Sequence, residues 1–297
     1  MTIPQARPLV DGVVGGPGPA ASAAPLAPER WTLPRWATGL IGAAFLVGLW
    51  EVLALTMFHP AIHSGVPTPP AVLGQFLHRD LFGYHDAHGQ FHKAIYGRNV
   101  RQTVGEAFTG FVVANLAAIA LAIAFVQVPV IEKALLRIAI ASYCLPILAI
   151  GPILTFVLHG DAPKSALAGL LCFFPTLVGT VLGLRSADRA SLDVIRASGG
   201  GTWAQLVKVR LRAAIPSTFA ALQIAAPSAM LGAIIGEFLG NSDYGLGILM
   251  INAQAELEVA RLWGVALLTT GIGGLAYLLV GLLSRLAAPW APRQERI

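Results

Sequence analysis

Charged residues are scarce in this chain of 297 residues: Asp, Glu, Lys and Arg together make up 12% of it. A soluble globular domain usually carries about 25% charged residues. Here hydrophobic residues make up 56% of the chain, and the mean hydropathy is +0.70. This composition excludes an ordinary water-soluble domain and indicates a protein whose outer surface faces lipid.

Motifs for catalysis and for nucleotide binding are missing as well. The segment GDAPKS, which begins at Gly160, ends in Lys-Ser but lacks the glycine that precedes the lysine of a phosphate-binding loop. The chain has no HExxH motif, and no Ser/His/Asp set falls within an apolar run. We therefore expect no enzyme activity and no cofactor, and any ATP used must be hydrolysed by another chain.

Cysteine is limited to Cys144 and Cys172, and both lie within apolar runs. Their spacing suits neither a metal site nor a redox pair, so we expect two buried apolar side chains. The net charge is +5, which suits basic edges at an anionic lipid surface. Since the sequence shows no soluble fold with a basic stripe, we expect no nucleic-acid partner.

What the chain does have is apolar length. A helix needs about 20 apolar residues to cross the bilayer core. The segments that qualify are Ala37–Phe58, Val104–Val126, Ile138–Leu158, Ser165–Leu184, Ser217–Gly240 and Leu262–Leu283. Pro146 and Pro152 predict a kink or a break in the third segment, and Gly232, Gly236 and Gly240 predict a closely packed face on the fifth. We therefore expect an all-α membrane protein with about six transmembrane helices.

The ends of the chain differ from its middle. Residues 1–35 are rich in Pro, Ala and Gly and have few large apolar side chains, so we expect a disordered N-terminal tail. The transmembrane domain is expected at 36–290, followed by a short C-terminal tail, 291–297. With six spans both termini share one side, and 14 of the 20 Lys and Arg residues fall there. Because basic loops stay in the cytoplasm, we expect both termini to be cytoplasmic.

The loop 59–101 is then expected on the outer side. Apolar residues recur in it at helical spacing and predict a short amphipathic helix on the outer membrane face: Val72, Leu73, Phe76, Leu77 and Leu81. The same loop contains HDAHGQFH, in which His85, Asp86, His88 and His92 offer ligands for Zn²⁺. Gly83 and Gly89 favour an ordinary polar loop, so we expect no metal site here, and a Zn²⁺ site is the alternative.

The segment SLDVIRASGGGTWAQLVKVRLRAAIP, residues 191–216, is a polar stretch between two apolar runs. Ser191 is a candidate N-cap of a short helix, and Gly199 can end that helix in the left-handed conformation of a C-cap. Thr202 is a candidate N-cap of a second helix that continues into the fifth apolar segment. We predict a helix–turn–helix that projects from the membrane and bends at Gly199, able to insert into a groove on a soluble partner. A solvated loop held by its positive charge is the alternative.

This segment resembles the cytoplasmic loop of the permease subunits of bacterial ABC importers, whose pattern is EAA-x3-G-x9-I-x-L-P. Asp193 stands at the position of the glutamate, and Gly199 matches the glycine. Val209 and Leu211 match the later apolar pair, and Pro216 matches a second proline that is usual a few residues on. The segment GAIIGEFLGNSDYGLGIL is similar to the membrane glutamate and GLG segment of the nitrate/sulfonate/taurine-type permeases. LWE, VPTPP and TGF also occur in the order of that subfamily.

The sequence departs from the family pattern at a few positions. Val194 and Ile195 replace the two alanines, and Arg212 stands where the first proline is expected. Glu106 stands where an arginine is often found early in the second span. These departures concern the details of partner docking.

The resemblance implies a type I ABC importer permease in the bacterial inner membrane. Cytoplasmic ATPase subunits would dock on the loop, with Asp193 in contact and Gly199 setting the bend. Val209 and Leu211 would pack the second loop helix onto the first. An outer binding protein would deliver a small anionic or polar organic solute, and a second permease chain would complete the pair. A self-sufficient secondary transporter or channel is the alternative, for which we find no internal repeat.

Glu237 lies in the fifth apolar segment, where an ionisable group costs about 3 kcal/mol and is often functional. We expect Glu237 either to act in the gate or the subunit interface, or to accept a hydrogen bond from a neighbouring span as a structural residue.

Overall fold

The computed structural model describes residues 34–56, 66–77, 84–85, 91–92, 95–144, 146–240 and 242–290. Its helices are α1 (Arg35–Thr56), α2 (Pro69–Gly74), α3 (Tyr96–Gln127), α4 (Pro129–Cys144), α5 (Ile147–Val157), α6 (Ala162–Arg185), α7 (Arg189–Ala197), α8 (Thr202–Gln205), the π-helical segment η2 (Leu206–Arg210), α9 (Leu211–Leu239), α10 (Leu246–Ala255) and α11 (Val259–Ala287). Two short strands, β1 (Tyr84–His85) and β2 (Phe91–His92), pair antiparallel. The chain divides after Leu46 into two units, and the elements from α2 onward belong to the second.

Five helices in the described part of the chain are long and apolar enough to cross a membrane. They are α1, α3, α6, α11 and the continuous helix that runs from α8 through η2 and α9. These helices account for five of the predicted segments and confirm an all-α membrane protein. The first predicted segment was drawn to Phe58, which lies outside the described residues, and α1 ends at Thr56.

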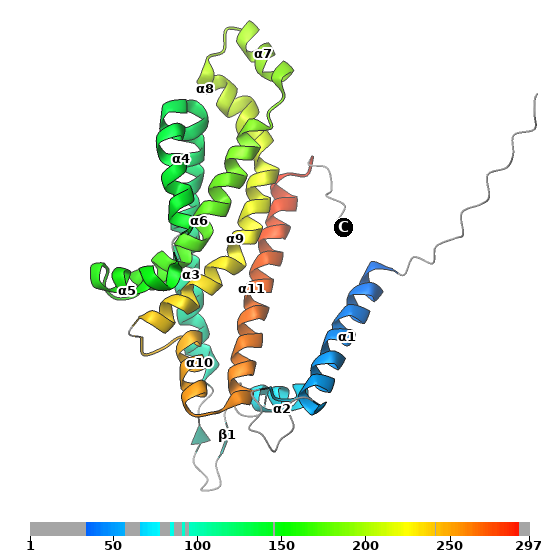
Figure 1. Cartoon of the computed structure of the whole chain (residues 1–297). Helices are drawn as coiled ribbons and strands as arrows, with labels where there is room; N and C mark the ends of the chain where they lie inside the picture. Colours follow the sequence, from blue (N-terminus) through cyan, green and yellow to red (C-terminus); the bar gives the residue numbers. More distant parts are fainter. Residues whose placement is uncertain are drawn as a thin grey trace, which may run out of the picture. The chain divides into compact units, whose positions relative to one another are not determined.

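The third predicted segment, Ile138–Leu158, is not one spanning helix. α4 ends at Cys144, and α5 begins at Ile147 with Pro146 as its N-cap. A proline lacks the N–H that would continue the helix and disfavours a helical conformation in the residue before it. The predicted break is therefore confirmed. α4 contacts α3 and α6, and α5 lies crosswise to them against α6 and α9 (Figure 1).

α6 packs between α3 and α9, and small residues allow the close approach (Figure 1). A Cβ atom at Gly232 would lie 2.6 Å from Cα of Ala168, and one at Gly236 would lie 2.7 Å from Cα of Lys164. The predicted packing face of the fifth segment is therefore in contact with α6. Cys172 is buried in the same core, as expected.

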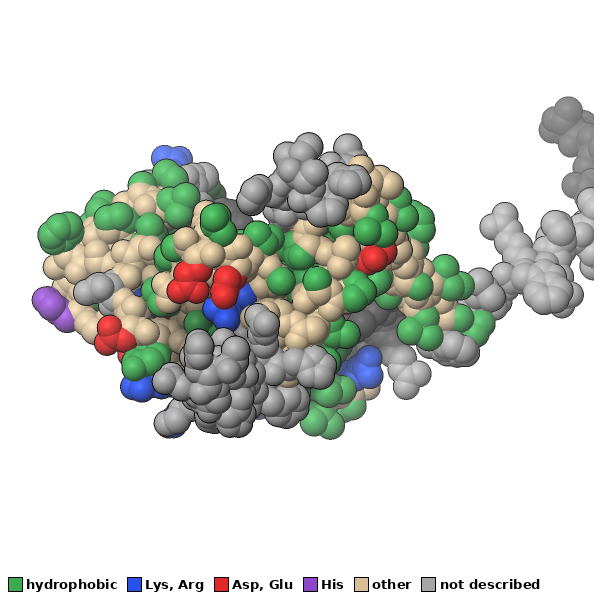
Figure 2. Space-filling model, turned by 90° about the horizontal axis from the view of Figure 1, so that it is seen from below, with side chains coloured by type: hydrophobic (Ala, Val, Ile, Leu, Met, Phe, Trp, Pro, Cys, Tyr) green, Lys and Arg blue, Asp and Glu red, His purple; other side chains and the backbone are tan. Residues whose placement is uncertain are grey.

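The long helices place two different regions at opposite ends of the second unit. α3, α6 and α11 run toward the end that carries α7, and α9 runs back from it (Figure 1). α10 and the start of α3 lie at the other end, where the backbone N–H of Gly245 donates to Oδ1 of Asn99 (2.7 Å). Large hydrophobic side chains are exposed along α3 and α11, among them Leu116 and Leu279, as contact with lipid requires. On the face seen from below, acidic and basic side chains lie next to one another among hydrophobic ones (Figure 2).

The short helix predicted in the outer loop is present as α2. Val72 is buried and Leu73 is exposed, and the ring of Phe76 lies 5.2 Å from that of Tyr96 in α3. Leu81, the last residue of the predicted helix, lies outside the described residues, as do the N-terminal tail up to residue 33 and the C-terminal tail from residue 291.

Candidate functional site

α7 begins with a capped N-terminus that the sequence placed three residues too late. Asp188, not Ser191, is the N-cap: its Oδ2 atom accepts hydrogen bonds from the backbone N–H and the hydroxyl of Ser191, both at 3.0 Å. The aspartate stands outside the helix, where its carboxylate can reach the free N–H groups of the first turn. The bond from the Ser191 N–H holds the pKa of Asp188 below its usual value.

Gly199 ends α7 in the predicted left-handed conformation, with φ of +80°. The N–H of Gly199 donates to the carbonyl of Arg196 (2.9 Å), and the N–H of Gly200 donates to the carbonyl of Ile195 (2.8 Å). These bonds satisfy carbonyls that the helix end leaves open. The N-cap of α8 is Gly201, and the predicted cap Thr202 is instead its first helical residue without a capping bond. The expected helix–turn–helix is present.

The tip of this helix–turn–helix offers both apolar and ionic groups to a partner. Val194 is 63% exposed and Trp203 is 69% exposed, although both are large hydrophobic residues. Asp193 is exposed beside them and forms a surface ion pair with Arg196 (3.4 Å). α7 lies at the far end of the unit from α10 (Figure 1). An exposed apolar patch with an ionic rim is typical of a protein-binding surface. We call residues 185–216 the coupling loop, after the role that the resemblance implies for it.

The second helix of the coupling loop is anchored in the helical bundle. Leu206 is buried, and Leu211 packs against the same cluster, whose other buried members lie in α3, α6 and α9. None of the cluster's described members comes from α7, so the packing that the cluster documents for Leu211 is on the bundle, and its packing on the first loop helix stays a prediction. Val209 is half-buried. Pro216 lies inside α9 without ending it.

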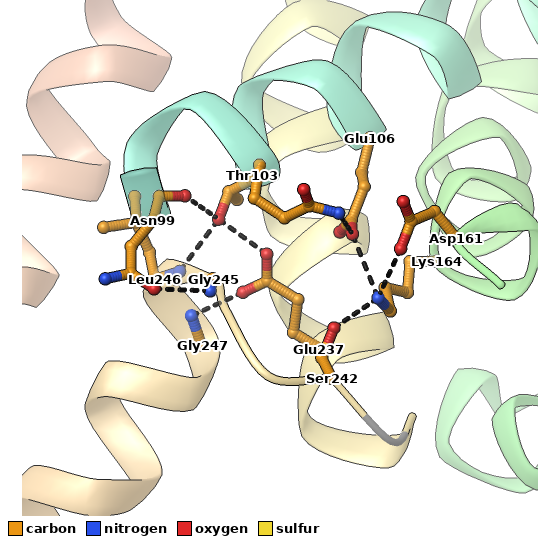
Figure 3. A network of polar contacts seen from close by, with 11 residues as sticks. Asn99, Thr103, Glu106, Asp161, Lys164, Glu237, Ser242, Gly245, Leu246 and Gly247 are labelled. Atoms are coloured by element: carbon orange, nitrogen blue, oxygen red, sulfur yellow. Dashed lines mark hydrogen bonds and ion pairs between the residues drawn. The ribbon is translucent and has the colours of Figure 1, made fainter. Parts of the chain in front are cut away.

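Glu237 is fully buried at the other end of α9, in a polar network (Figure 3). Its Oε1 atom accepts a hydrogen bond from the hydroxyl of Thr103 in α3 (2.6 Å), and its Oε2 atom accepts one from the N–H of Gly247 in α10 (2.6 Å). The N–H of Leu246 donates in turn to the Thr103 hydroxyl oxygen (2.8 Å). One carboxylate therefore ties α3, α9 and α10 together.

The glycine at position 245 makes room for this carboxylate. Gly245 has φ of +147°, which L residues rarely adopt, and a Cβ atom there would overlap the carboxyl group of Glu237. Its N–H donates to Asn99 in α3. The GLG segment and the membrane glutamate are thus two halves of one contact.

Lys164 forms the second centre of the network, in the first turn of α6. Its ammonium donates to Oε1 of Glu106 (3.1 Å), to Oδ1 of Asp161 (2.8 Å) and to the hydroxyl oxygen of Ser242. The side chains of Lys164 and Glu106 are only 4% and 2% exposed, whereas that of Asp161 is 60% exposed. The bond from Lys164 holds the pKa of Asp161 below its usual value.

Glu237 was a candidate from the sequence, whereas Lys164 and Asp161, which form the second centre of the network, were not. The available signal was an ionisable residue at the edge of an apolar segment, since Lys164 directly precedes the fourth predicted span. The histidine cluster of the outer loop cannot be placed, because Asp86 and His88 lie outside the described residues. Within the described part of the chain, no three His, Cys, Asp or Glu side chains are grouped as a metal site.

The five long apolar helices in the described part of the chain define a multi-pass membrane protein. Residues 114–291 match the family described as the binding-protein-dependent transport system inner membrane component. The chain is 30% identical over 235 residues to a probable ABC transporter permease protein of Haemophilus influenzae, covering 78% of this chain and 89% of that protein. The chain belongs to this family of ABC importer permeases.

Other relatives carry the names of different solutes. The chain is 25% identical over 264 residues to a putative aliphatic sulfonates transport permease of Bacillus subtilis, covering 88% of this chain and 90% of that protein. It is 33% identical over 162 residues to a riboflavin transport system permease of Chloroflexus aurantiacus, covering 54% of this chain and 60% of that protein.

Proposed function

We propose that the chain forms the translocation path for a small anionic or polar organic solute, such as a sulfonate, and that a separate ATPase subunit drives it by docking on the coupling loop. The observation that carries this proposal is the bend at Gly199, which presents exposed Val194 and Trp203 beside the ionic pair Asp193–Arg196. The sulfonate relative covers most of both chains and supports that solute class.

The continuous helix Thr202–Leu239 supplies a route for the movement. Its 38 residues span about 57 Å at 1.5 Å per residue, from the coupling loop to the Glu237 contact. Because the backbone stays helical from Thr202 to Leu239, closure of two ATPase subunits on ATP would shift α9 together with its bonds to α3 and α10. Glu237 would then keep α9 attached to α3 and α10 while the outer end of the path opens and closes, which we call the outer gate.

The assembly follows from the same proposal. The basic side of the chain, with both termini, lies on the cytoplasmic side of the inner membrane. An outer binding protein delivers the solute at the opposite end. A second permease chain, identical to this one, completes the path. A self-sufficient transporter remains the competing function, and it predicts uptake by the purified chain without any ATPase.

The test compares two glycines of the coupling loop. Gly199 has φ of +80° and Gly201 has φ of −75°, and a Cβ atom at either position would meet nothing within 4 Å. Gly199→Ala should therefore strain the bend by about 1–2 kcal/mol, whereas Gly201→Ala should not. In proteoliposomes with the co-purifying ATPase, we expect Gly199→Ala to lose uptake while ATP hydrolysis continues. Full uptake by Gly199→Ala, or uptake without the ATPase, would contradict the proposal.

A further inference from the structure

A cavity of about 430 Å³ lies between the first turns of α3 and the start of α6. Its lining includes Arg98, Arg101, Gln102, Asp161 and Ser165. This volume falls in the range of small-molecule sites. The cavity lies at the end of the unit opposite to the coupling loop, because the start of α3 is the end that contacts α10 (Figure 1). Neither the loop nor the Glu237 contact accounts for it.

The charges around this cavity do not balance. Glu106 and Asp161 both line it, and both carboxylates are bound by the ammonium of Lys164 (Figure 3). Among the described residues, neither Arg98 nor Arg101 forms an ion pair. With Lys164 counted, three cations and two carboxylates lie at the cavity among the described residues, which is an excess of one positive charge.

The two arginines are placed to act together. They lie three residues apart on α3, so their side chains leave the same face of the helix. The guanidinium of Arg98 lies 3.6 Å from the centre of the Tyr244 ring, which supports its plane. A guanidinium above a ring face keeps the N–H groups at its own edge available to a ligand in the plane of the guanidinium.

We propose that Arg98 and Arg101 form a binding site for the oxyanion group of the transported solute at the outer end of the permease. The guanidinium fork matches two oxygens of a sulfonate, carboxylate or phosphate group, and the hydroxyl of Ser165 adds a further donor. The proposal rests on the proposed function, in that the ligand is the imported solute. The shared chemistry is an oxyanion, which an anionic lipid headgroup also carries.

The test measures binding to the full chain in nanodiscs of phosphatidylcholine, with ethanesulfonate and inorganic sulfate as probes in calorimetric titrations at constant ionic strength. We expect ethanesulfonate to bind the unmodified chain. Arg98→Gln and Arg101→Gln should each weaken binding about tenfold, since each removes a charged hydrogen-bond donor. The matched control is Arg285→Gln, at an exposed arginine in the last turn of α11, which should leave binding unchanged.

Three results would overturn the proposal. The first is that neither probe binds the unmodified chain. The second is that the double variant Arg98→Gln/Arg101→Gln binds the probes as well as the unmodified chain does. The third is that, in a second set of discs that contain phosphatidylglycerol, the arginines affect only the thermal stabilisation by this lipid, which would make this a lipid site. Co-purification of the ATPase separates the anion site from the proposed function. If the ATPase docks on the unmodified chain but neither anion binds to it, only the anion site is contradicted. Docking of the ATPase on Gly199→Ala and the other coupling-loop variants tests the proposed function.

Discussion

The coupling loop and the buried network both contain an acidic residue paired with a basic one, but the two pairs stand in opposite surroundings. Asp193 and Arg196 are 68% and 64% exposed, and water screens their charges. Glu106 and Lys164 are almost fully buried, so the ion pair between them compensates for the hydration that both charges lose. The exposed pair is free to change partners on docking, whereas the buried pair keeps the helices in register.

The largest expected effect follows from breaking the buried pair. Lys164→Met should lower the free energy of unfolding by about 3–5 kcal/mol, because it leaves the buried Glu106 carboxylate uncompensated. Arg196→Met, the matched change in the exposed pair, should cost about 0–1 kcal/mol. Unfolding of the two variants in nanodiscs provides the measurement. The comparison fails if the two losses are equal.

A second substitution sharpens this result. Adding Glu106→Gln to Lys164→Met removes the buried charge and should restore part of the lost stability. No recovery in the double variant would mean that the lysine acts through packing against Gly236 and not through its charge.

Removal of the Glu237 carboxylate should rank second. Glu237→Ala leaves the N–H of Gly247 without its acceptor and should cost about 1–3 kcal/mol, while the Thr103 hydroxyl can still donate to the carbonyl of Asn99. Glu237→Gln keeps an acceptor oxygen for Gly247 and should retain most of the stability. The same pair of variants in an uptake assay tests the proposed gate: a role in the outer gate predicts that Gln preserves uptake and Ala does not.

The loop should show the reverse behaviour, with small effects on stability and clear effects on binding. Trp203→Ala should change the stability by less than about 0.5 kcal/mol, since the side chain is exposed. It should weaken ATPase docking about tenfold or more if the ring fills a pocket on the partner. Trp290→Ala, at another exposed tryptophan, is the control and should leave docking intact. Unchanged docking by Trp203→Ala would remove the apolar tip from the interface.

The same contrast separates what could be read from the sequence from what could not. Five of the six apolar spans, the break at Pro146 and the left-handed Gly199 depend on neighbouring residues, and these predictions are confirmed. The network joins Thr103 to Glu237 across 134 residues and Asn99 to Gly245 across 146. Such pairs depend on how α3, α9 and α10 pack, which no local pattern specifies. The N-cap prediction was wrong for a different reason: Asp188 and Ser191, three residues apart, are both good capping types, and only the backbone decides between them.

The smallest expected effect concerns the start of the coupling loop at low pH. Asp188 has a pKa below its usual value because the Ser191 N–H binds its carboxylate. A group whose pKa is lowered by folding stabilises the folded state above its unfolded pKa of about 3.9, and this contribution is lost as the pH falls through the lower folded value. Protection of the α7 amides from hydrogen exchange should therefore decrease below about pH 4. Asp188→Asn keeps a capping oxygen but cannot titrate, so its α7 protection should not depend on pH in this range. An equal decrease in Asp188→Asn would assign the pH dependence to another group and leave the cap as a neutral hydrogen bond.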